Sequence, residues 1–313
     1  MVSMKKKMSS MPRVTPQRKK VKDSMEDKVF YTTINVVLFL ILLIVGLPLL
    51  YVLAASFSSP TAVTSGKVLF WPVDFSMEGY KAVFQHKLIL RAYGNSMFYM
   101  VVGTCINVVL TMFAAYPLSR RELPGGKWIM LMFTFTMVFT GGLIPTYLLL
   151  SNLHMLNTVW AMIIPGAVTA YNMIVACTFI KSNIPKELLE AAQIDGCNDL
   201  QFFFQFVIPL SKAVIAVITL YYAIGHWNTY FSALVYLKDE NLYPLQIVLK
   251  DILVSNQITA NMVYDAELAE AREGLSELLK YSLIVVSVIP VLIIYPFVQK
   301  YFVKGVMVGS VKG

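Results

Sequence analysis

The sequence predicts an all-α, polytopic membrane protein with six transmembrane helices. Its mean hydropathy is +0.65, and 57% of its 313 residues are hydrophobic while only 14% are charged. Soluble domains carry roughly a quarter charged residues. The apolar residues form continuous runs near the roughly 20 residues that a helix needs to cross a bilayer, not the alternating pattern of a membrane barrel. The expected spans are residues 31–54, 92–118, 128–150, 158–180, 213–237 and 281–302.

The distribution of lysine and arginine predicts how the chain is oriented. These residues are dense in the N-terminal tail, and they recur in the loops after the second and fourth spans and at the C-terminus. Cytoplasmic loops carry such an excess, so both termini are expected in the cytoplasm. This predicts a basic cytoplasmic tail at 1–28 and a six-helix transmembrane domain at 29–313, with a cytoplasmic loop at 182–210 and a long external loop at 238–279.

The net charge of +8 is explained by this topology, so nucleic-acid binding is not expected. Contact between the basic tail and anionic membrane lipid fits the same pattern. A disordered segment that only sets the topology explains it at least as well.

The chain lacks the residues that most catalytic chemistry requires. It has no Gly-rich phosphate loop, no Gly-x-Ser-x-Gly elbow and no His-Glu-x-x-His pair, so neither an ATPase site, a catalytic triad nor a metal site is expected. The central parts of the spans contain no Asp, Glu, Lys or Arg, on which ion-coupled carriers commonly depend. His226 is the one titratable exception, and a structural histidine is the simpler explanation. If the chain moves a solute uphill, the energy is therefore expected to come from a partner.

A polar helix-turn-helix is expected within the cytoplasmic loop. Pro185 suits the first position of a helix that ends near Gly196, because glycine permits a left-handed turn. Glu187 and Glu190 lie near the positive end of this helix. A capping box formed by Asn198 and Gln201 is expected to start the next segment. By itself, such a pattern fits an amphipathic connector on the membrane.

The combined spacing of this loop is more specific than that. Glu190, Ala191 and Ala192 are followed by Gly196 and then by Pro209, which opens the fifth span. The stretch resembles the signature loop of ABC importer permeases, the binding-protein-dependent inner-membrane components. In that family Ile and Leu usually precede the proline, where this chain has Phe206 and Ile208. The resemblance extends over most of the chain from residue 31 onward and implies the type I importer permease fold.

Further motifs resemble the carbohydrate branch of this family. They are Ser56-Phe57-Ser58, Glu78-Gly79-Tyr80, His226-Trp227-Asn228 and the C-terminal run from Lys304 to Gly313. The stretch 141–145 is similar to the subgroup that serves complex oligosaccharides, such as plant cell-wall fragments.

The resemblance implies a site for an ATPase partner. The helix at 186–196 becomes a coupling helix docked on a cytoplasmic ATPase. The expected coupling residues are Glu187, Glu190, Ala191, Ala192, Asp195, Gly196 and Pro209, with Lys304, Gly309 and Lys312 as an ATPase-contacting tail. This chain would bind no cofactor itself, and ATP and Mg²⁺ would be used by the partner.

The sugar path and the external contacts are expected elsewhere. Aromatic, amide and hydroxyl groups suit sugar recognition, which makes Tyr171, Asn172, Trp227, Asn228 and Tyr230 candidates for the substrate pathway. An interfacial aromatic belt and hydrogen bonding between helices remain open as alternatives for these residues. By resemblance, Tyr243, Pro244 and Gln246 would contact the extracellular binding protein.

The sequence thus predicts a permease subunit, not an enzyme, in the plasma (inner) membrane of a bacterium. The expected partners are a second, non-identical six-span permease, two ATPase subunits and a solute-binding protein, and the sugar is not specified. A secondary carrier and a membrane-embedded protease are the alternatives. Transport without an ATPase would favour the carrier, and the missing nucleophile and metal motifs argue against the protease.

Overall fold

The computed structural model describes residues 24–120, 122–259 and 266–310. Throughout these residues the regular structure is helical, without a strand, which confirms the predicted all-α class. The helices are α1 (Met25–Ser56), α2 (Pro60–Thr64), α3 (Glu78–Gln85), α4 (Lys87–Phe98), α5 (Thr104–Ser119), α6 (Gly126–Val138), α7 (Leu143–Asn152), α8 (Trp160–Ile163), α9 (Ala170–Asn183), α10 (Lys186–Ile194), α11 (Asp199–Phe202), α12 (Ile208–Leu210), α13 (Lys212–Trp227), α14 (Phe231–Tyr236), α15 (Leu245–Thr259) and α16 (Ala266–Ser310).

Three shorter helical segments complete the secondary structure. Two of them, η1 (Tyr99–Gly103) and η2 (Phe203–Val207), are π-helical, and η3 (Glu240–Leu242) is a 3-10 turn. Single π-turns inside α-helices are uncommon and are frequent at functional sites. Here η1 joins α4 to α5, and η2 joins α11 to α12.

The chain divides into two compact units, residues 1–50 and 51–313. The described part of the first unit belongs to α1, whose most apolar window has a mean hydropathy of 3.1. Glu26 and Asp27 lie in its first turn, where the helix dipole favours negative charge. The expected boundary at residue 28 stays a prediction, because residues 1–23 lie outside the described part.

Three described helical stretches are long and apolar enough to cross a membrane without a break. They are Met25–Ser56, Lys87–Ser119 and Gly274–Pro296. The stretch Lys87–Ser119 runs through α4, η1 and α5 and contains the second expected span. α16 begins at Ala266, so the helix of the sixth expected span starts within the segment 238–279 that was expected to form a loop.

One bend falls within the third expected span and another directly before the fifth, whose own range is interrupted at residues 228–230 between α13 and α14. α6 and α7 meet at 117° and the segment Asp199–Leu210 meets α13 at 80°. The first bend falls at Gly141 and Gly142, and Gly142 has a positive φ of 85°. Glycine adopts this backbone without steric cost, which explains why the helix breaks there. The second bend falls at Ser211, directly after Pro209 and Leu210.

The fourth expected span is interrupted between α8 and α9. The interruption contains Pro165 and Gly166; proline removes a backbone donor and glycine weakens a helix. Within the described residues, the structure thus has three continuous spans, or up to five when each bent pair counts as one. The predicted number of six is not confirmed.

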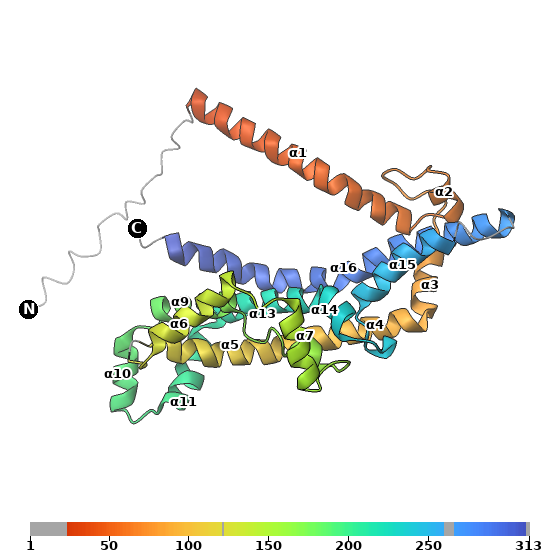
Figure 1. Cartoon of the computed structure of the whole chain (residues 1–313). Helices are drawn as coiled ribbons and strands as arrows, with labels where there is room; N and C mark the ends of the chain where they lie inside the picture. The colour runs from red at the N-terminus through yellow and green to blue at the C-terminus, as the bar shows by residue number, and fades with distance from the viewer. Residues whose placement is uncertain (1–23, 121, 260–265, 311–313) are drawn as a thin grey trace, which may run out of the picture. The chain divides into compact units, whose positions relative to one another are not determined.

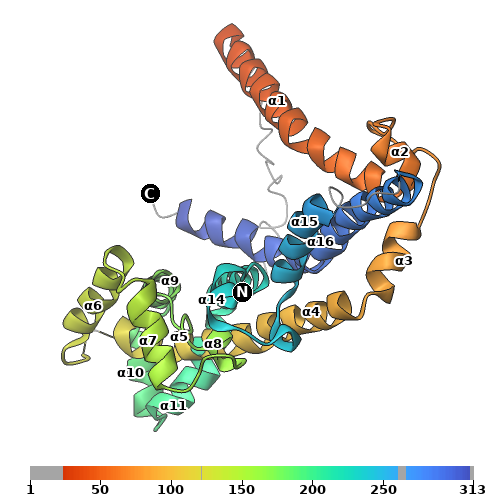
Figure 2. The same cartoon turned by 45° about the vertical axis from the view of Figure 1, so that its right-hand side comes forward.

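The second unit has its largest core where α5, α9 and α13 pack together. Ala115, Met173, Ala176 and Ile218 are fully buried there. Figure 1 shows α5 and α9 beside each other, with α10 and α11 at one end of this unit. Turning the molecule leaves α10 and α11 at that end, away from α3 and α15 (Figure 2). The core therefore holds the polar helix-turn-helix at one extremity of the unit.

Candidate functional site: the loop at α10 and an intramembrane cavity

α10 forms as the sequence indicates, with one difference at its start. Pro185 is the N-cap, with φ −62° and ψ 146°, not the first helical residue. Its extended backbone still suits a helix start, because proline needs no amide donor there. At the other end Gly196 has a φ of 82°, and its amide donates to the Gln193 carbonyl over 3.0 Å. This left-handed turn is the expected helix end.

The second segment of the loop starts with the predicted capping box. The Gln201 amide donates to Asn198 Oδ1 over 2.9 Å, and the Asn198 amide donates to Gln201 Oε1 over 3.0 Å. Phe202 and Phe203 then enter the core beside α5. Pro209 lies in α12, so it precedes the bend into α13. The core and the cap together fix the position of the turn.

α10 buries only one narrow face. Ala192 is packed against the core formed by α5, α9 and α13. Glu187, Glu190 and Ala191 are exposed, and so is Ile194, with 86% of its surface accessible. Asp195 is also exposed. Because only the small Ala192 is buried and the apolar Ile194 is exposed, most of the surface of α10 is uncovered. Such a surface is suited to binding a protein partner.

Ion pairs connect this loop to the end of α5. Lys186 Nζ lies 3.3 Å from Glu122 Oε1 and 3.4 Å from Glu190 Oε1, and Arg120 Nη1 lies 2.5 Å from Asp199 Oδ1. The Glu122 carboxyl has a lowered pKa, chiefly because it accepts a hydrogen bond from its own backbone amide. A hydrogen bond from Lys186 lowers this pKa further. Hydrogen bonds to Glu122 and Glu190 raise the pKa of Lys186. Both shifts favour the ionised forms of Glu122 and Lys186.

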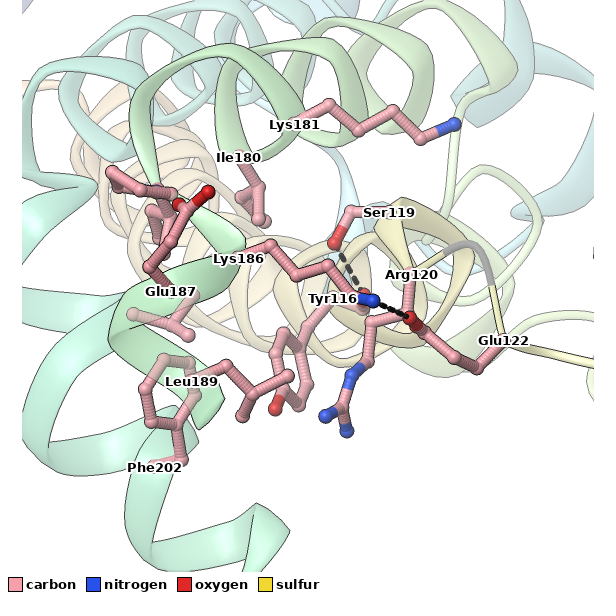
Figure 3. A pocket seen from close by; sticks show the side chains of 13 residues that line it. Tyr116, Ser119, Arg120, Glu122, Ile180, Lys181, Lys186, Glu187, Leu189 and Phe202 are labelled. Carbon is pink, nitrogen blue, oxygen red and sulfur yellow. Dashed lines mark hydrogen bonds and ion pairs between the residues drawn. The ribbon is translucent and has the colours of Figure 1, made fainter. Parts of the chain in front are cut away.

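A pocket of about 640 Å³ lies between these elements. Figure 3 shows Lys186 reaching across it to Glu122, with Tyr116 and Arg120 on the α5 side. Tyr116 Oη and Arg120 Nε are buried without a hydrogen-bond partner in the described part of the chain. The base of α10 is therefore polar and incompletely packed.

A second, smaller cavity of about 320 Å³ lies among α5, α7, α8, α9, α13 and α14. The polar side chains that line this cavity are amides, hydroxyls and one imidazole. No Asp, Glu, Lys or Arg is among the described residues that line it. The polar lining residues are Asn107, Thr146, Thr169, Asn172, Tyr221, Tyr222, His226, Thr229, Ser232 and Tyr236. A cavity of this kind offers hydrogen bonds without a fixed charge.

The predicted substrate residues are spread over different environments. Asn172 lines the smaller cavity, whereas Tyr171 is exposed and packs edge-on against Tyr221 at 5.8 Å. Trp227 is buried, and its indole Nε1 donates to the Ser287 carbonyl over 3.1 Å. The Asn228 amide donates to the Ile224 carbonyl over 3.0 Å.

Tyr230 packs beside the cluster that contains Tyr99 and Ile247. The structure therefore brings only Asn172 of the five candidates onto the cavity. The roles of all five in transport stay predictions.

The structure brings further residues to this cavity, and Asn107 is one that the sequence did not single out. Asn107 Nδ2 lies 2.9 Å from His226 Nε2. Tyr222 Oη lies 2.7 Å from Thr111 Oγ1, and it accepts a bond from the Thr169 amide over 3.1 Å. Asn107 lies in an apolar stretch and belongs to no recognisable motif. The one sequence signal for it is an amide side chain in the middle of an expected span.

The expected binding-protein contacts lie at the start of α15. The Tyr243 carbonyl accepts from Asn95 Nδ2 over 3.0 Å, and the Leu245 amide donates to Ser96 Oγ over 2.8 Å. Pro244 and Gln246 flank Leu245. These bonds fix the segment to α4, and within the segment Pro244 is buried while Tyr243 and Gln246 are half-buried. Its contact with a binding protein stays a prediction.

The expected C-terminal contacts fall mostly outside what the structure describes. Lys304 and Gly309 belong to α16, but their burial and contacts lie outside what the structure describes. Lys312 lies outside the described residues. Their contact with an ATPase stays a prediction.

Residues 88–308 match the family of binding-protein-dependent transport system inner membrane components. This match spans well over half of the chain, so the chain belongs to this family. It is accordingly a multi-pass permease component of an ABC transporter in the inner membrane, and not an enzyme. Membership implies that it works with a further permease, an ATPase and a binding protein. The secondary carrier is not supported.

Curated relatives and a solved structure agree with this membership. The chain is 41% identical to the polygalacturonan/rhamnogalacturonan transport system permease protein YtcP of Bacillus subtilis (strain 168), over 92% of this chain and 100% of that protein. It is 39% identical to protein LplC of the same organism, over 85% and 89%. It also resembles a chain of a bacterial ABC transporter involved in the import of the acidic polysaccharide alginate, with TM-score 0.81 and 36% identity, over 90% of this chain and 99% of that one.

Proposed function

We propose that this chain is the permease subunit of an ATP-driven importer that moves a uronate-containing oligosaccharide by alternating access. The substrate class is suggested by two similar proteins, one named for polygalacturonan and rhamnogalacturonan and the other for alginate. Galacturonan and alginate are polymers of uronic acids. A binding protein outside the cell delivers the oligosaccharide to the permease.

The observation that carries this proposal is the exposed surface of α10. A nine-residue helix held to the core through Ala192 leaves Glu187, Glu190, Ala191 and Ile194 uncovered. In an importer this surface docks on the ATPase, so closure of the ATPase pair on ATP pushes α10. Ion pairs from Lys186 and Arg120 then transmit the movement to the end of α5.

The remaining partners follow from the same arrangement. Two ATPase subunits bind ATP and Mg²⁺, and a second, non-identical permease completes the path across the membrane. Lys304, Gly309 and Lys312 approach the ATPase from the C-terminus. Both termini and α10 lie in the cytoplasm of the bacterium, and the external segment with Tyr243, Pro244 and Gln246 receives the binding protein.

Transport by the reconstituted importer tests this function. The chain is co-expressed with its neighbouring transport subunits, purified and placed in proteoliposomes with ATP enclosed and binding protein outside. Labelled trigalacturonate is the first probe, and an alginate trisaccharide and neutral galactotriose are the comparisons. We expect uptake of a uronate probe that stops when ATP is omitted. Uptake that persists without ATP would contradict the mechanism, and uptake of galactotriose alone would contradict the substrate class.

A further inference from the structure

The crossing of α13 with the helical segment from η1 to α5 places an amide and an imidazole together inside the membrane domain. Gly103 makes this possible, because a Cβ atom there would lie 2.5 Å from His226 Nε2. Asn107, one turn further along, then reaches His226 over 2.9 Å. Asn107 has 1% of its surface exposed and His226 has 9%. The pair is therefore held by close helix packing.

Hydrogen bonding in this pair is incomplete. The Asn107 Nδ2 atom bonds His226, but Asn107 Oδ1 is buried without a partner among the described residues. The Thr104 hydroxyl, on the preceding turn, is also buried without a hydrogen-bond partner among the described residues. If the amide were turned over, Nδ2 would take the place of Oδ1 as the unpaired atom. Buried polar atoms of this kind are uncommon in folded proteins and require an explanation.

A third polar group on the same cavity is also available. Asn172, from α9, lines the cavity together with Asn107 and His226, and its surface is 4% exposed. Its backbone amide bonds Thr169, but its carboxamide makes no hydrogen bond to a described residue. Two helices thus present amide groups with unused bonding capacity to one cavity, while Tyr222 is already engaged by Thr111 and Thr169.

The chemistry of this lining selects a kind of ligand group. A carboxylate is only an acceptor and is expensive to bury without a cation, and no Lys or Arg of the described chain lines the cavity. A sugar hydroxyl both donates and accepts, so it can satisfy an amide oxygen or an amide nitrogen in either orientation of Asn107 and Asn172.

We propose that Asn107, Asn172 and His226 form a subsite that binds ring hydroxyls of the transported sugar and leaves its carboxylates to groups outside this cavity. Asn107 and Asn172 contact the hydroxyls, and His226 holds the Asn107 amide in place. This subsite rests on the proposed function. It assigns sugar contacts to this subunit itself, through residues of which the sequence singled out only Asn172 for the substrate path.

Substitution of Asn172 in the reconstituted importer tests the subsite. Since its carboxamide bonds no described residue, a purely structural role predicts no effect of Asn172→Ala. The subsite predicts that trigalacturonate imported per ATP hydrolysed falls roughly fivefold or more, the order expected when a buried hydrogen bond is lost. Asn35→Ala is the matched control, because that side chain is exposed on α1 and does not line the cavity. It should leave the ratio unchanged.

A second substitution separates hydroxyl from carboxylate recognition. The carboxylate introduced by Asn172→Asp accepts a bond from a sugar hydroxyl but repels a sugar carboxylate, so this variant should retain more import per ATP than Asn172→Ala. Co-purification of the ATPase shows that each variant is assembled. An unchanged ratio in assembled Asn172→Ala overturns the subsite, and an Asp variant weaker than the Ala variant overturns the hydroxyl assignment. Failure of the wild-type importer to move any of the three probes would instead contradict the proposed function.

Discussion

Gly196 ends α10 with a φ of 82°, a backbone that residues with a Cβ atom adopt only at a cost of about 1–2 kcal/mol. Gly196→Ala should therefore distort the end of α10 and weaken its association with the ATPase. Co-purification of the ATPase from detergent-solubilised membranes measures this association. Gly94→Ala is the control, since a Cβ at this helical position meets no atom within 4 Å. Equal ATPase recovery with both variants would contradict the role of this turn.

Gly103 has a different role, because its backbone angle is ordinary but its neighbour is close. An added Cβ would meet the His226 ring at 2.5 Å, so α13 or η1 must move apart in Gly103→Ala. Overpacking of this kind costs about 1–3 kcal/mol. The unfolding temperature of the purified complex should fall for Gly103→Ala and not for Gly94→Ala. An unchanged unfolding temperature would mean that the two helices separate freely here.

At the scale of elements, the pairs formed by Lys186 connect α10 to the segment after α5. The pKa of Glu122 is lower in the folded protein than in the unfolded chain. Its ionised carboxylate therefore contributes fully to stability above the unfolded-state pKa, near 4.3. This stabilisation is lost as the pH falls through the lower pKa of the folded state. Both partners are exposed, and exposed pairs contribute little to stability. We expect Glu122→Gln to leave the unfolding temperature at pH 7 nearly unchanged, by differential scanning fluorimetry. A large decrease would show that the pair is buried in the assembly.

The sequence predicted some of these elements well and others poorly. The cap at Asn198 and the turn at Gly196 depend on neighbouring residues, so local sequence was sufficient to locate them. The breaks at Gly142 and Pro165 depend on whether neighbouring helices tolerate an interrupted helix, and a hydropathy pattern does not contain that information. The expected spans 128–150, 158–180 and 213–237 were therefore placed correctly as apolar segments but not as continuous helices.

The same distinction applies to the site residues. Glu190, Ala191 and Gly196 are neighbours along one short helix, so their spacing alone placed them together. The cavity joins Asn107, Asn172 and His226 from three separate helices, and such a meeting depends on helix packing. Trp227 looked equally suitable by residue type, yet its indole N–H is bonded to Ser287 in the core.

At the scale of the whole molecule, the large exposed apolar surface must be buried against lipid or another subunit. Large exposed apolar side chains occur along α1, α6 and α16, and such surfaces are stable only against lipid or another subunit. We expect the isolated chain to aggregate when its detergent is removed, and the co-expressed importer to stay monodisperse in lipid nanodiscs by size-exclusion chromatography. Monodisperse behaviour of the isolated chain in detergent-free buffer would contradict its assignment as a membrane subunit.

The most direct test of α10 as the coupling element is whether a substitution in α10 removes the ATPase from the complex. Wild-type chain and the Glu190→Lys variant are each recovered from detergent-solubilised membranes, and the co-purifying proteins are identified. We expect the wild type to bring down an ATPase, a second permease and a solute-binding protein. We expect the variant to insert normally but to lose the ATPase or its coupling to uptake. Normal ATPase association together with normal ATP-driven uptake in Glu190→Lys would contradict the assignment of α10 as the coupling element.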